Sequence, residues 1–103
     1  IQLNTTMNNN IIIAENTNLV DDDIKYLKNI NTLNLSKNNY ISDLSPLVKT
    51  KKLDIRQCRN IRILPYNTLL DYINVSSENY HCNLNNLGIN NLKIKNINIE
   101  DYY

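Results

Sequence analysis

The sequence contains little of several residue types on which particular folds and chemistries depend. Its 103 residues include one glycine, two prolines, two cysteines and one histidine, and no tryptophan or phenylalanine. A single glycine cannot build a glycine-rich phosphate loop. Two cysteines do not make a disulfide scaffold. His81 and the adjacent Cys82 would supply only two ligands, whereas a structural zinc site needs about four, so no metal and no cofactor is predicted.

The chain also lacks a large net charge and a long apolar run. Its formal net charge is +1, its charged fraction is 20% and its hydrophobic fraction is 42%. These values are typical of one folded domain over residues 1–103 and give no bulk attraction to nucleic acid or to an anionic membrane. No run reaches the ~18 apolar residues of a membrane span. There is no visible signal peptide and no initiator Met, so we expect a chain that is processed or is a piece of a longer one. Neither end shows a cysteine-rich cap of a kind found in secreted proteins, so we expect an intracellular protein, cytoplasmic or nuclear.

Asparagine and isoleucine, in contrast, are abundant. The chain has 22 Asn and 15 Ile, both encoded by AT-rich codons, whereas glycine, alanine, proline and arginine are scarce. This bias indicates an AT-rich genome. An individual Asn therefore needs evidence from its position before a role is assigned to it.

A repeated pattern supplies such evidence. Segments 11–19, 33–41 and 53–61 all follow the pattern apolar-x-apolar-x-x-(Asn or Cys)-x-x-(Leu or Ile). The sixth position of these segments is occupied by Asn16, Asn38 and Cys58. Weaker copies begin at 73–75 and 92–94, so the period is close to 20 residues. Regular spacing of this kind is typical of stacked repeat architectures.

The repeat predicts both a fold and a core. Alternation of apolar residues indicates short strands with one buried face, and such units can bury that face only by stacking on one another. The strands near 33–35, 53–55, 73–75 and 92–94 are therefore expected to be parallel neighbours in one sheet. Asn16, Asn38 and Cys58 are expected to form a buried structural ladder, since an Asn amide can bond the backbone groups of its own turn and the adjacent one.

The units at 33–47 and 53–64, with the sequences LNLSKNNYISDLSPL and LDIRQCRNIRIL, resemble the leucine-rich repeat family. The first is similar to the short internalin-like type and the second to the cysteine-containing type found in F-box substrate adaptors. The resemblance implies an α/β solenoid of about four to five repeats of about 20 to 22 residues, with a parallel β-sheet on its concave face. It also implies that the protein binds another protein.

The parts outside the strands are less regular. Asp21, Asp22 and Asp23 are predicted to begin a short helix, because acidic side chains suit the positive end of the helix dipole. A bound cation is the alternative interpretation of these three carboxylates. Residues 1–10 are expected to be an N-terminal cap or a frayed end.

The side of the strands that faces away from the core is the candidate binding surface. If the apolar positions of each strand point inward, the intervening positions point outward and form lateral rows, since a strand alternates its side chains between two faces. The predicted binding residues on this concave face are Lys52, Asp54, Arg56, Tyr72, Asn74, Lys93 and Lys95. This set is more basic than the chain as a whole, and Arg and Tyr are residue types favoured at binding hot spots.

Three functions are considered for this surface. The first is a non-catalytic protein–protein interaction module without cofactor, metal or small-molecule substrate. The second, which the resemblance of the unit at 53–64 implies, is the substrate-recognition segment of a ubiquitin-ligase adaptor of the F-box type. The third is nucleic-acid binding by the basic face, which is less favoured because arginine-rich runs and an aromatic stacking platform are missing. No catalytic set of residues is visible, so an enzyme is not predicted.

Overall fold

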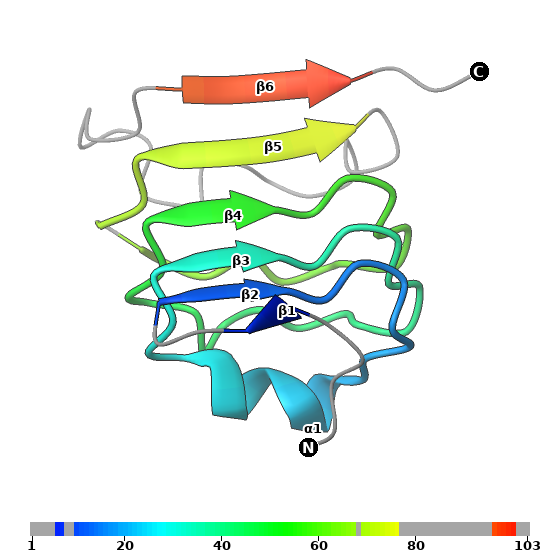
Figure 1. Ribbon diagram of the computed structural model, residues 1–103. Helices are drawn as coiled ribbons and strands as arrows, with labels where there is room; N and C mark the ends of the chain where they lie inside the picture. The colour runs from blue at the N-terminus through cyan, green and yellow to red at the C-terminus, as the bar shows by residue number, and fades with distance from the viewer. Residues whose placement is uncertain (1–5, 8–9, 68, 77–95, 101–103) are drawn as a thin grey trace.

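The computed structural model of this chain describes residues 6–7, 10–67, 69–76 and 96–100, and it describes side chains for residues 10–67 and 69–76. These residues form a mainly parallel β-sheet with few helical residues, an α/β arrangement (Figure 1). The strands are β1 (Thr6–Met7), β2 (Ile11–Ile13), β3 (Thr32–Asn34), β4 (Lys52–Asp54), β5 (Tyr72–Ser76) and β6 (Asn96–Glu100).

Each strand lies next to the strand that precedes it in the chain. The sheet order is β1-β2-β3-β4-β5-β6; the pairs from β2 to β6 are parallel, and β1 pairs with β2 in the antiparallel sense (Figure 1). The parallel strands predicted near 33–35, 53–55 and 73–75 are thus confirmed. Residues 92–94 lie outside the described residues, and the strand beside β5 is β6, which begins at Asn96.

The pairing register is regular along the sheet. Leu33 pairs with Leu53, and Leu53 pairs with Ile73, so these neighbours are 20 residues apart in sequence. Ile12 pairs with Leu33 at a separation of 21 residues, and Ile73 pairs with Ile97 at a separation of 24. Residues that are distant in sequence thereby become lateral neighbours roughly 5 Å apart.

The apolar positions of the central strands point into one core. The inward residues are at most 1% exposed; they are Leu33, Leu35, Leu53, Ile55, Ile73 and Val75. From the opposite side, the segments that join the strands, here called the returns, contribute further buried residues, which are Leu19, Ile24, Leu27, Ile41, Leu44, Leu47, Ile61, Leu64 and Leu70. A short strand with one apolar face is stable here because its neighbours and its own return cover that face.

The first unit differs from the prediction by one residue. Ile12 and Ala14 are buried, whereas Ile11 and Ile13 are 38% and 42% exposed. The expected alignment had placed Ile11 and Ile13 on the inner face. Because side chains alternate along a strand, a shift of one residue exchanges the two faces, and three consecutive isoleucines give no alternation from which the correct face can be read.

A left-handed residue follows each of the first three parallel strands. Asn16, Lys37 and Gln57 have φ angles of 53°, 61° and 59°, and Asn18 has a φ of 58°. Glycine and asparagine adopt this conformation more readily than lysine or glutamine. The turn that leads away from the sheet therefore has a fixed backbone shape, and this chain builds it without glycine.

The first return contains the helical residues. Helix α1 (Asp21–Ile24) continues into the 3₁₀ helix η1 (Lys25–Leu27), as the three aspartates predicted. The carboxylate of Asp23 accepts a hydrogen bond from the backbone N–H of Val20 at 3.0 Å, which satisfies a donor at the helix start. The second and third returns are irregular, with one parallel bridge between Asp43 and Ile63.

Candidate binding surface

The outward side chains of β2 to β5 and of Arg56, which follows β4, form one surface, here called the strand face. Its members are Ile11, Ile13, Thr32, Asn34, Lys52, Asp54, Arg56, Tyr72 and Asn74. The register aligns them in rows across the sheet: Ile11, Thr32, Lys52 and Tyr72 are successive lateral neighbours in one row. The next row is Ile13, Asn34, Asp54 and Asn74.

Five of the seven predicted binding residues come together on this side of the sheet, but Asn74 among them is buried, with only 8% of its surface exposed. Lys52 lies opposite Tyr72, and Asp54 lies opposite Asn74, across the β4–β5 pair. Arg56 follows on the same side. The other two predicted residues, Lys93 and Lys95, lie outside the described residues.

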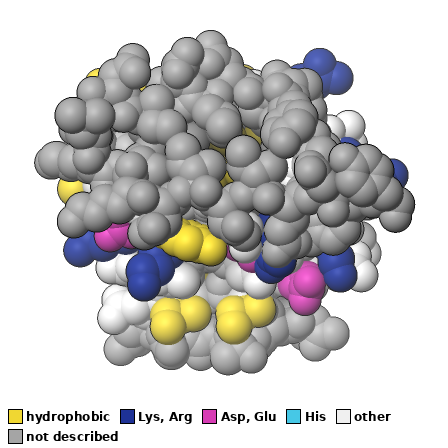
Figure 2. Space-filling model, turned by 90° about the horizontal axis from the view of Figure 1, so that it is seen from above, with side chains coloured by type: hydrophobic (Ala, Val, Ile, Leu, Met, Phe, Trp, Pro, Cys, Tyr) yellow, Lys and Arg dark blue, Asp and Glu magenta, His cyan; other side chains and the backbone are white. Residues whose placement is uncertain are grey.

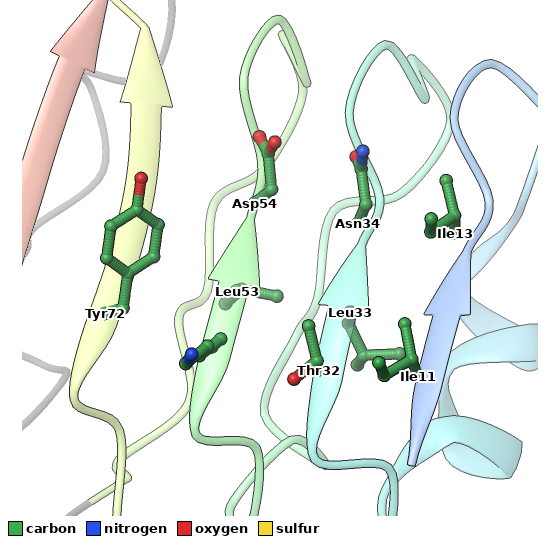
Figure 3. Close-up of a pocket in the computed structure, with 9 residues that line it drawn as sticks. Ile11, Ile13, Thr32, Leu33, Asn34, Leu53, Asp54 and Tyr72 are labelled. Atoms are coloured by element: carbon green, nitrogen blue, oxygen red, sulfur yellow. The ribbon is translucent and has the colours of Figure 1, made fainter. Parts of the chain in front are cut away.

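A hollow with a volume of about 240 Å³ opens on the strand face. Its lining, which is mostly apolar, comprises Ile11, Ile13, Thr32, Leu33, Asn34, Lys52, Leu53, Asp54 and Tyr72 (Figure 3). The short side chain of Thr32 on β3 lies between Ile11 of β2 on one side and the longer side chains of Lys52 and Tyr72 on the other. The hollow therefore follows from one small residue on β3 between larger side chains of the neighbouring strands.

The side chain of Arg56 is bound by the carboxylate of Asp54 on β4. Its Nε donates to Asp54 Oδ1 at 3.0 Å, and its terminal Nη2 donates to Asp54 Oδ2 at 2.7 Å. The side chains of Arg56 and Asp54 are only 26% and 15% exposed. Asn74 Nδ2 donates to the same carboxylate at 3.4 Å. This geometry is that of a bidentate pair, so the positive charge of Arg56 is largely balanced within the strand face.

Lys52 differs from Arg56 in both exposure and pairing. It is exposed, and among the described residues it takes part in no ion pair. Lys37 pairs with Glu15 at 3.5 Å beyond the strand ends, and both side chains are about half exposed. Among the described residues, the uncompensated charge beside the hollow is therefore that of Lys52. The view from above in Figure 2 shows hydrophobic side chains of the described residues with basic and acidic side chains near them.

Two of the three residues of the predicted ladder occupy the expected place. Asn38 and Cys58 are fully buried, and Cys58 Sγ donates to the carbonyl oxygen of Leu35 at 3.0 Å. Asn16 is exposed and takes the left-handed position, so its assignment to the ladder is wrong. The position equivalent to Asn38 belongs to Thr17, whose hydroxyl donates to the carbonyl oxygen of Ala14 at 2.8 Å. The cause is the same one-residue shift that exposes Ile11 and Ile13.

The amide of Asn38 joins two turns. Its Oδ1 accepts hydrogen bonds from the backbone N–H groups of Thr17 at 3.2 Å and Leu19 at 3.0 Å. Its Nδ2 donates to the carbonyl oxygens of Ala14 at 2.9 Å and Leu35 at 2.8 Å. The two N–H groups thereby gain an acceptor, whereas the two carbonyl oxygens also accept from the Thr17 hydroxyl and the Cys58 thiol.

Asn67 is a second buried asparagine whose side chain bonds backbone groups, in this case within the returns. Asn67 Nδ2 donates to the carbonyl oxygens of Leu47 and Thr50, and its Oδ1 accepts from the backbone N–H groups of Leu69 and Leu70. The sequence analysis did not single out Asn67, because one occurrence makes no periodic pattern. Ser76 was also missed; its Oγ accepts from the backbone N–H of Gln57 at 2.8 Å.

Asp21 links the first return to the second. Its carboxylate accepts hydrogen bonds from the Ser42 hydroxyl at 2.6 Å, the Ser42 N–H at 2.7 Å and the Asp43 N–H at 3.1 Å. Partial burial acts to raise the pKa of Asp21, but these hydrogen bonds outweigh it, and the pKa lies below its usual value of 3.8. The role of Asp21 is therefore to tie two neighbouring units together.

The described part of the chain offers no metal centre and no membrane span. Within it, no three His, Cys, Asp or Glu side chains are grouped so that they could hold a metal ion. Nor does any helix within it have the length and apolar character needed to cross a bilayer. In comparisons with known proteins, no family model, no curated protein and no solved structure matches this chain. The strand face is thus the candidate site that the described residues provide.

Proposed function

We propose that this chain is a short solenoid of the leucine-rich repeat type and that it binds another protein through its strand face. Binding, rather than catalysis, is the proposed activity, and neither cofactor nor metal takes part in it. The observation that carries the proposal is the lateral alignment of outward side chains at intervals of 20 to 21 residues on four parallel strands. Such rows turn four separate sequence segments into one continuous contact surface.

The repeat assignment rests on what recurs from unit to unit. Strands β3, β4 and β5 each bury an alternating apolar pair against the same core. Lys37 and Gln57 repeat one turn conformation, and Asn38 and Cys58 repeat one buried position directly after it. Equivalent residues performing equivalent tasks support the solenoid interpretation over a coincidental parallel sheet.

The chemistry of the strand face supports a protein partner. Exposed isoleucines, an aromatic ring, amides and one uncompensated lysine lie within a few strands of one another. Protein interfaces combine an apolar, aromatic centre with a polar rim in this way. Within the described part of the strand face, Lys52 is the lysine without an ion pair, and a single lysine is a weak basis for nucleic-acid binding, which depends on neutralising several phosphates.

An intracellular setting is part of the proposal. Cys58 is a fully buried cysteine whose sulfur donates to a backbone carbonyl. A reduced cysteine used as a structural donor suits a reducing compartment.

The test compares two pairs of substitutions in the full chain used as bait. Tyr72→Ala with Lys52→Ala changes the strand face, and Lys28→Ala with Lys49→Ala changes exposed lysines of the returns. We expect the strand-face pair of substitutions to reduce the free energy of binding to a captured partner by roughly 1–3 kcal/mol. The return-side pair should change the affinity for the same partner little, and calorimetry measures both affinities. If the return-side pair weakens binding more than the strand-face pair, the proposal is wrong.

A further inference from the structure

Resting on the proposed function, we propose that the hollow over β3 receives one apolar side chain from an acidic segment of the partner protein. The hollow would hold a branched aliphatic or aromatic residue against Ile11 and Ile13. An Asp or Glu close to that residue would approach Lys52. The partner is thus defined by two chemical groups, an apolar side chain and a nearby carboxylate.

The size of the hollow favours a side chain over a small-molecule ligand. Its volume is about 240 Å³, whereas sites for cofactors and other small molecules measure roughly 300–1,000 Å³ and enclose most of the ligand. The hollow is instead an open depression rather than an enclosed cavity. An inserted side chain on an otherwise superficial backbone fits this shape.

The walls of the hollow specify the apolar group. Ile11 and Ile13 are exposed by 38% and 42%, and they stand on the same strand at one side of the hollow. Tyr72 lies on the other side and completes an apolar lining. Covering two neighbouring isoleucines removes apolar surface from water, and this is the main driving force for association.

The charges around the hollow specify the carboxylate. Asp54 is held by Arg56 and Asn74, so the negative charge on the lining is already balanced. Lys52 is exposed and, within the described residues, has no ion-pair partner. An acidic group of the partner is therefore complementary to this rim, and a basic group is not. This places the centre of binding over β2, β3 and Lys52 rather than on Arg56.

The inference is tested by selecting random 12-residue peptides displayed on phage against the folded full chain. We expect the selected peptides to carry an aliphatic or aromatic residue within two positions of an Asp or Glu. Synthetic versions in which the apolar residue is replaced by Ser should bind roughly tenfold more weakly. Versions in which the acidic residue is replaced by Lys should also bind more weakly.

Substitutions in the chain locate the peptide site. Ile13→Ser should weaken binding of the synthetic peptide roughly tenfold, and Lys52→Gln should weaken it roughly two- to fivefold, as removal of one exposed charge pair does. Thr32→Tyr fills the hollow while the two isoleucines and Lys52 stay in place, and it should abolish binding. Lys49→Gln on a return is the matched control for Lys52→Gln and should have no effect. Thermal melting of each variant verifies that it is folded.

The outcomes separate this inference from the proposed function. Enriched peptides without acidic residues, or peptides insensitive to the substitutions at Ile13, Thr32 and Lys52, would overturn the inference. If such peptides bind more weakly to a folded Arg56→Ala variant, which changes a strand-face residue outside the lining of the hollow, strand-face binding stands and only the hollow is rejected. If no peptide is enriched, the inference is overturned, whereas the proposed function is still decided by the capture experiment with the full partner.

Discussion

The side-chain amide of Asn38 donates a hydrogen bond to the backbone carbonyl of Ala14, 24 residues earlier in the chain, at 2.9 Å. Both residues are completely buried. The same amide also accepts from the first turn and donates to its own turn. One side chain thus fixes the spacing of two successive turns in a place where water has no access.

Replacement of Asn38 by Leu should therefore be strongly destabilising. Leucine is similar in size but removes the acceptor of the Thr17 and Leu19 N–H groups and one of the donors to two buried carbonyl oxygens, so we expect a loss on the order of 3 kcal/mol in the free energy of unfolding. Urea denaturation measures it. Asn39→Leu, at the adjacent exposed position, should change stability by no more than about 0.5 kcal/mol. Similar losses for both variants would contradict the role assigned to Asn38.

Cys58 should resist modification while the protein is folded. Its thiol is fully buried and hydrogen-bonded to Leu35, so reaction requires at least local unfolding. In a chain carrying Cys82→Ser, which isolates Cys58, we expect labelling by a thiol reagent to be at least a hundredfold slower in buffer than in concentrated urea, as a rough figure. With both cysteines present, we predict that Cys82 reacts first. Equal labelling rates of Cys58 in buffer and in urea would show that its assignment to a buried position is wrong.

The pair of Arg56 and Asp54 should contribute to stability as well as to the strand face. Arg56→Ala leaves a carboxylate that is only 15% exposed without its cation, so we expect a loss of about 1–2 kcal/mol. Asp54→Ala should cost a similar amount, and the double variant should lose less than the two single losses combined. A double-mutant cycle measured by urea denaturation gives the coupling. Strictly additive losses would mean that the two side chains do not interact in solution.

Stability at acid pH should depend on Asp21. Its pKa is lowered in the folded state from the usual value of 3.8, so the folded state favours the ionised carboxylate. The resulting stabilisation is fully present above the unfolded pKa and is lost as the pH falls through the folded pKa. Wild type and Asp21→Asn should therefore differ in urea midpoint at pH 6 and converge below pH 3.8. Asp22→Asn, at a neighbouring exposed aspartate, should show no such convergence; an unchanged difference for Asp21→Asn at all pH values would contradict this account.

The central strands could be predicted from sequence because their alternation is unambiguous. Leu33, Leu53 and Ile73 recur every 20 residues with polar neighbours on both sides, and the structure places them as lateral partners in the core. The first unit could not be read in this way, because the run Ile11–Ile13 is apolar at every position. Only the turn geometry and the packing of Ala14 decide which isoleucine points inward.

The candidate site was predictable only in part for a different reason. Sequence spacing identified Lys52, Asp54, Tyr72 and Asn74 as neighbours, and the register confirms this. It could not reveal that Arg56 is bound to Asp54, since that depends on side-chain conformation. Nor could it reveal the hollow, which arises from the contrast between one small residue on β3 and larger ones on the strands beside it.

The left-handed turns have an energetic consequence that connects to the scarcity of glycine. Lys37 and Gln57 hold φ angles of 61° and 59°, a conformation that is strained for residues with a Cβ atom. The ion pair of Lys37 with Glu15 is half exposed and therefore weak. The backbone N–H of Gln57, which bonds Ser76, would be retained by any residue except proline. Lys37→Gly and Gln57→Gly should each raise the free energy of unfolding by about 0.5–1 kcal/mol, so a chain with one glycine carries built-in positions at which its thermal tolerance can be increased.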